Sequence, residues 1–208
     1  MNKPMTLVVA IAVAAAWPFA ATSQSKKDEA KSEQAASKGG GVSREDQRRF
    51  MDIAEANMAE IATGKLAQSK GQSQEVKDFA KHMIEDHTRM LKEGEQLGAK
   101  KGLTPPKELK KEHQQASAKL EKLSGEEFDR AYAKQMVDDH QKALKLVQDT
   151  AKNAKDAELK AMAEKATPEI QKHLEMAKGL AAAGAGSSKA GKSSKAEHAK
   201  GEHAKQAK

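Results

Sequence analysis

The chain has 208 residues, no Cys and a formal net charge of +7. The absence of Cys excludes disulfides, thiolate metal sites, a Cys nucleophile and a lipid anchor on an N-terminal Cys. The charge lies mainly near the ends, because residues 43–180 carry almost as many acidic as basic side chains. Nucleic-acid strands need a basic groove with interleaved aromatic side chains, and this chain has only four Phe, one Tyr and one Trp. We therefore expect no nucleic-acid partner for the folded part.

Residues 1–23 have the layout of a secretory signal peptide, with one Lys, a largely apolar run from Met5 to Trp17 and then small residues. The run is too short to form a membrane-spanning helix. We expect cleavage between Ala20 and Gln24 and therefore a periplasmic or secreted protein. Residues 24–42 are polar and contain a Gly triplet, which predicts a flexible linker.

Residues 43–183 contain four long helical patterns and a short polar one over 107–123. Each long pattern begins at a residue that can cap a helix N-terminus: Ser43, Ser73, Ser124 and Asp156. Ser124 is followed by Glu127, which predicts a capping box. Gly71 and Gly102 are expected to end the first two helices.

Apolar residues in these patterns recur at spacings of three and four, with no strand-like alternation. Short connections make neighbouring helices antiparallel. The sequence therefore predicts an all-α, up-and-down antiparallel four-helix bundle over residues 43–183, with one short extra helix. Residues 184–208 are predicted to form a Lys-rich low-complexity tail.

Two nine-residue segments in different predicted helices have nearly the same sequence, which we call the repeated phrase. Residues 79–87 read FAKHMIEDH, and residues 132–140 read YAKQMVDDH. Positions i and i+4 share one face of a helix, so His87 and His140 fall on the apolar faces behind Met83 and Met136. His173 does the same on the last helix, and Glu60 interrupts the apolar face of the first. These observations give the candidate metal ligands, which are His87, His140, His173 and Glu60, with Asp86, Asp139 and Glu169 close by.

Imidazoles and carboxylates from facing helices are how bundles hold zinc, copper or iron, and the sulfurs of Met83, Met90 and Met136 favour copper. The alternative is equally open at this point, because a His on an apolar stripe is often a core-edge residue with one hydrogen bond, and Met is ordinary core filler. His82 and His113 are expected on polar faces, outside any site.

Three spaced segments of the bundle read RRFMDIAEANMAEIATGKLAQSKGQSQEVKDFAKHMIEDH, LSGEEFDRAYAKQMVDDHQKALKL and PEIQKHLEMAKGL. Together they resemble one large bacterial family, domain of unknown function 4142, over about residues 45–180. The resemblance implies an exported or envelope-associated, ferritin-like bundle, and it implies no established activity. The usual di-iron sites of ferritin-like proteins use Glu-x-x-His, whereas the residues three before the inward His residues are Ile84, Val137 and Ile170.

The sequence also lacks a Gly-rich phosphate loop, a nucleophile elbow and a zinc-protease motif, so we expect a protein that is not an enzyme. Two interpretations follow. In the first, the exported bundle binds a transition metal through the inward His and carboxylate residues. In the second, it is a metal-free structural or stress-related protein whose basic tail, residues 184–208, binds anionic envelope polymers. The sequence does not predict an oligomeric state.

Overall fold

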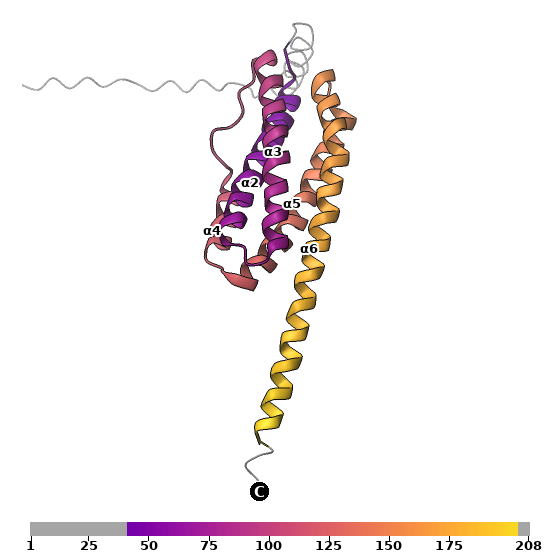
Figure 1. Cartoon of the computed structure of the whole chain (residues 1–208). Helices are drawn as coiled ribbons and strands as arrows, with labels where there is room; N and C mark the ends of the chain where they lie inside the picture. The colour runs from indigo at the N-terminus through magenta and orange to yellow at the C-terminus, as the bar shows by residue number, and fades with distance from the viewer. Residues whose placement is uncertain (1–40, 204–208) are drawn as a thin grey trace, which may run out of the picture. The chain divides into compact units, whose positions relative to one another are not determined.

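The computed structural model describes residues 41–203, with side chains as far as residue 184. The predicted signal peptide and all but the end of the predicted linker lie outside these residues. The described part is all-helical, as predicted, and contains no strand (Figure 1). Its helices are α2 (Arg44–Lys70), α3 (Gln74–Lys101), α4 (Lys111–Glu121), α5 (Gly125–Asn153) and α6 (Ala157–His203). None of them is long and apolar enough to cross a membrane.

Three of the predicted helix starts are confirmed by their hydrogen bonds. The Ser43 and Ser73 hydroxyls accept from backbone N–H groups three residues on, at 3.1 and 3.2 Å. The Asp156 carboxylate accepts from the N–H of Leu159 at 3.0 Å. Each bond satisfies a donor that the first turn of a helix leaves free.

The predicted capping box at the start of α5 is wrong, although the helix does begin there. Ser124 occupies the N-cap position, but its side chain makes no capping hydrogen bond. Gly125 takes a φ of 61°, so the backbone is left-handed where a capping box needs a regular first turn.

The order of the helices depends on the segment between α3 and α5. Residues 102–124, which include α4, return along the bundle, so that α5 starts beside the α2–α3 turn. There the Asp129 carboxylate accepts from the N–H groups of Gln72 and Ser73 at 2.9 and 2.8 Å. Consequently α3 and α5 run in the same direction. The main contacts of the four long helices are α2 with α3, α5 with α6, α2 with α5 and α3 with α6, and all four pairs are antiparallel.

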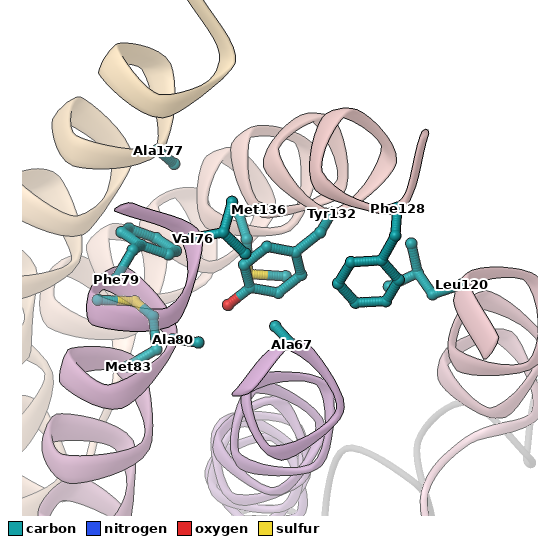
Figure 2. Close-up of a cluster of buried hydrophobic side chains, with 10 residues drawn as sticks. All are labelled: Ala67, Val76, Phe79, Ala80, Met83, Leu120, Phe128, Tyr132, Met136 and Ala177. Atoms are coloured by element: carbon teal, nitrogen blue, oxygen red, sulfur yellow. The ribbon is translucent and has the colours of Figure 1, made fainter. Parts of the chain in front are cut away.

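The parallel course of α3 and α5 explains the repeated phrase. The two phrases lie at the same level, so that like residues meet across the bundle. The rings of Phe79 and Tyr132 have centroids 6.1 Å apart. Met83 and Met136, both fully buried, belong to the same apolar cluster as these rings (Figure 2). The repeat is therefore a matched set of packing layers on two helices.

One polar layer of the bundle lies between two of its three apolar clusters. Phe79, Met83, Tyr132, Met136 and Ala177 belong to the first cluster, which also contains residues of α2 and α4 (Figure 2). Met90, Val147 and Ile170 form another cluster further along the helices. The three inward His residues fall between these clusters on α3, α5 and α6. Any site they form therefore has an apolar layer on each side along the helix direction.

The last helix continues past residue 183, where the composition predicted the start of a tail, and ends at His203. Residues 184–203 contain as many Gly and Ser as Ala and Lys, so intrinsic helix propensity does not account for this continuation. Pro168 lies within the helix.

At the end of the bundle opposite the α2–α3 turn, the carboxylate of Asp46 in the first turn of α2 binds the α5–α6 turn. Asp46 is fully buried, and it accepts from the N–H groups of Lys155 and Asp156 at 3.0 and 2.9 Å. These bonds fix the α5–α6 turn against α2, as Asp129 fixes the α2–α3 turn against α5. The two carboxylates thus set the relative level of the two helical hairpins.

We expect Asp46→Ala to lower the free energy of unfolding by about 2–4 kcal/mol, because it leaves two backbone donors without an acceptor. Urea unfolding followed by circular dichroism measures this change. Asp149→Ala is the matched control, since Asp149 is half exposed and pairs with Arg49 at 3.3 Å. It should change stability by less than about 1 kcal/mol. Equal losses in the two variants would contradict the role given to Asp46.

Candidate metal centre

Three imidazole rings meet in the middle of the bundle. His87 of α3, His140 of α5 and His173 of α6 are 2%, 0% and 1% exposed. Their ring centroids are separated by 5.5 Å (His87–His140), 5.2 Å (His87–His173) and 5.5 Å (His140–His173). One nitrogen of each ring lies within 4.8 Å of the corresponding nitrogens of the other two.

The tautomer of His87 follows from its partner on α2. Its Nδ1 lies 2.9 Å from Oδ1 of Asn57. The amide nitrogen of Asn57 donates to the carbonyl of Ile53 at 2.9 Å, which identifies Oδ1 as the oxygen facing His87. Nδ1 of His87 is therefore the donor, and its Nε2 carries the lone pair.

The other two rings are fixed in the same manner. Nδ1 of His140 donates to the carbonyl oxygen of Met136 at 2.9 Å. Nε2 of His173 donates to Oδ2 of Asp86 at 2.9 Å. The remaining nitrogens are Nε2 of His87, Nε2 of His140 and Nδ1 of His173, and all three are buried without a hydrogen-bond partner among the described residues. Three lone pairs are thus left in one buried layer.

Burial keeps these rings neutral. It lowers the pKa of His87 well below the ordinary value, and the neighbouring His140 and His173 lower it further. Burial likewise lowers the pKa of His140 to about 4. For His173, burial lowers the pKa even though the hydrogen bond to Asp86 acts in the opposite direction. At neutral pH the three rings therefore present lone pairs, which is the form in which His binds a metal.

Glu60 lies beside this layer and is buried at 6% exposure. Its Oε1 is 3.9 Å from Nδ1 of His140, and its Oε2 has no hydrogen-bond partner among the described residues. Burial, with a smaller contribution from the charge of Asp139, raises the pKa of Glu60 to about 8. Near neutral pH this side chain is therefore mostly a neutral acid.

The remaining predicted carboxylates lie further out. Asp86 holds the ring of His173 from outside, as described above. Asp139 is half buried and pairs with Lys142 at 3.3 Å. Glu169 pairs with Arg89 at 2.7 Å. The structure thus separates the seven predicted residues into a buried His triad, a buried acid and three outer carboxylates.

Sequence reasoning missed the placement of His82 and His113. The ring of His82 lies 5.6 Å from that of His173, and its Nε2 is 3.3 Å from Oδ2 of Asp86. The signal was present, because His82 precedes Asp86 by one helical turn. His113 lies elsewhere, with Nδ1 2.7 Å from the buried Glu55, and attaches α4 to α2.

A cavity of about 240 Å³ reaches the His layer from one side. His87, Asn57, Glu60, Asp139 and His113 are among the residues that line it. Its lining comes from all four long helices and the α4 region, so it lies between the α2–α3 hairpin and the α5–α6 hairpin. Between the two hairpins, α2 contacts α5 and α3 contacts α6. These contacts are less extensive than those of α2 with α3 and of α5 with α6 within each hairpin.

The fold is similar to those of several solved structures. A DUF305 fragment from Deinococcus radiodurans matches with a TM-score of 0.61 at 14% identity, over 68% of this chain and 98% of that one. CopM in the Cu(II)-bound form matches with a TM-score of 0.56 at 20% identity, over 65% of this chain and 95% of that one. CopM in the Cu(I)-bound form gives 0.54 at 18% identity, over 64% and 92%. At these identities the likeness establishes the helical-bundle fold alone.

No curated protein matches the chain. The sequence model of one family, described as a domain of unknown function (DUF4142), matches residues 30–180, which include the layered bundle and all three rings of the triad. The protein therefore belongs to the DUF4142 family.

Proposed function

We propose that this protein is an exported, non-catalytic bundle that binds one transition-metal ion through His87, His140 and His173. The observation that carries the proposal is the set of three buried ring nitrogens that lack hydrogen-bond partners among the described residues. A buried nitrogen acceptor left unpaired costs about 1–3 kcal/mol, and a metal ion would satisfy all three together. Ligand atoms on a four-coordinate ion are about 3.3 Å apart, so small ring movements would close the site.

The way in which the rings are held also supports a metal site. Each ring donates its other nitrogen's proton to a fixed oxygen, from Asn57, from the Met136 backbone and from Asp86. Outer partners of this kind orient metal-binding imidazoles and increase their basicity. A purely structural core His would also make one such bond, so the feature that favours a metal is that three rings held in this way share one buried layer.

Copper is the ion that we favour, with zinc next. Neutral imidazoles suit copper, zinc and iron, whereas iron sites in bundles also use ionised Glu. Here the buried carboxyl beside the layer, Glu60, has its pKa raised to about 8 in the metal-free protein. The structural neighbours include CopM in Cu(II)-bound and Cu(I)-bound forms, which supports copper for this chain as well.

Binding without catalysis is supported by the sequence, which lacks a Gly-rich phosphate loop, a nucleophile elbow and a zinc-protease motif. Export to the periplasm or outside is supported by residues 1–23. The Lys-rich residues 184–208 would bring the protein to an anionic envelope surface, and this second role would operate whether or not metal is bound.

We expect His140→Ala to lower copper affinity by more than about 100-fold, since loss of an outer partner alone typically costs 10–100-fold. Competition titration with a copper chelator measures the affinity. One equivalent of copper should also raise the melting temperature of the unsubstituted protein and leave that of the variant unchanged. His113→Ala is the control, because His113 is bonded to Glu55 away from the triad. Unaltered affinity in His140→Ala would rule out the triad as the ligand set.

Asn57→Leu tests the outer partner of His87. The substitution removes the oxygen that holds Nδ1 at 2.9 Å, and copper affinity should fall by about 10–100-fold while the three rings remain. Chelator competition again gives the affinity, and circular dichroism shows whether the variant is folded. If a folded Asn57→Leu protein binds copper as tightly as the original, the orienting role of Asn57 is wrong.

Glu60 should give the metal-free protein a distinctive pH dependence. Its folded pKa of about 8 lies above its ordinary value, so its contribution to stability is complete below about pH 4.5 and is lost as pH rises through about 8. The loss has a slope of up to about 1.4 kcal/mol per pH unit. Relative to the unsubstituted protein, Glu60→Gln should therefore gain stability steadily between pH 5 and 8.

Urea unfolding of both metal-free proteins at several pH values measures this difference. Comparing the two proteins cancels the titration of the His residues, which both contain. Stability curves that stay parallel from pH 5 to 8 would show that Glu60 ionises normally.

A further inference from the structure

A second cluster of potential ligands lies on the outer side of His173. One ligand atom each of His82, Asp86 and His173 lies within 4.8 Å of the others. The side chains of His82 and Asp86 are 34% and 25% exposed, whereas that of His173 is 1% exposed. This cluster therefore connects the surface of α3 with the buried triad.

One potential ligand atom of this cluster makes no hydrogen bond among the described residues. Nε2 of His82 is buried and lies 3.3 Å from Oδ2 of Asp86, but the two atoms are not aligned as a hydrogen bond, and Nε2 has no other partner among the described residues. The guanidinium of Arg89 donates a hydrogen bond to the other oxygen of Asp86, Oδ1, at 3.3 Å. The same guanidinium forms an ion pair with Glu169 at 2.7 Å. Oδ2 is thus left facing both His82 and His173.

His173 belongs to both clusters through different nitrogens. Its Nε2 faces outward to Asp86, and its Nδ1 is the unpartnered nitrogen of the buried triad. A neutral imidazole has one proton and one lone pair. The ring can therefore bind an outer ion through Nε2 while Nδ1 is protonated, or an inner ion through Nδ1 while Nε2 is protonated. An ion that passes from outside to inside needs only this exchange of tautomer, with no net gain or loss of protons.

We propose that His82, Asp86 and His173 form an outer metal position through which a transition-metal ion reaches the buried triad. The proposal rests on the function proposed above and specifies its route of loading. Two imidazoles and one carboxylate suit divalent copper or zinc and leave at least one coordination position for water, as a transient site requires. The competing route is the cavity that reaches His87 and has His113 at its wall.

The first test measures the rate of zinc uptake by the full-length, tag-free protein, using stopped-flow mixing with a zinc-sensitive dye. His82→Ala should slow uptake by about tenfold or more, because it removes one of the outer ligands. His113→Ala, which alters another half-exposed His at the cavity wall, should load at the original rate. Uptake that is slowed in His113→Ala and unchanged in His82→Ala would overturn the proposal in favour of the cavity.

The second test is made at equilibrium and does not depend on the inner site. The His87→Gln/His140→Gln variant, checked for helicity, should retain one weakly bound zinc ion through the outer position. Adding His82→Ala to this variant should abolish that binding. Residual binding that is insensitive to His82, or its complete absence, would overturn the outer position. Failure of the proposed function has a different signature, because the His87→Gln/His140→Gln variant would then bind zinc as tightly as the original protein.

Discussion

The matched level of α3 and α5 is the constraint on which the site depends. These helices run in the same direction because residues 102–124 return the chain to the α2–α3 turn before α5 begins. A shift of one residue along either helix would rotate its His away from the core by about 100°. Asp46 and Asp129, each bonded to two backbone N–H groups of a distant turn, hold the hairpins at the level that aligns the rings.

The sequence predicted the elements of this bundle better than their connections. Apolar spacing and caps located the helices, because both are local properties of the chain. The direction of α5 relative to α3 is not local, since it depends on whether residues 102–124 turn back at once or run along the bundle. The repeated phrase contained that information: aromatic, Met and His residues at equal spacing can face each other in order only when their helices are parallel.

For the site, helical periodicity predicted that His87, His140 and His173 would lie inward, and it predicted nothing about their tautomers. These depend on Asn57, a backbone carbonyl and Asp86, which lie on other turns or other helices. His82 was predicted on a polar face, and its side chain is indeed partly exposed. It nevertheless lies next to α6, because its ring is close to that of His173. A single-helix projection cannot show what the neighbouring helix places at the edge of a face. Glu169 illustrates the reverse error, because its spacing from His173 is favourable and its actual partner is Arg89.

The origin of the three rings gives the buried layer a mechanical consequence. His87 comes from the hairpin of α2 and α3, whereas His140 and His173 come from the hairpin of α5 and α6. An ion held by all three would act as a crosslink between the two hairpins, whose helices contact each other less extensively than those within each hairpin and which the cavity separates in part. Metal binding and the association of the two hairpins would then be coupled. A change that separates the hairpins would weaken metal binding, and removal of the ion by a chelator would make the hairpins separate more easily.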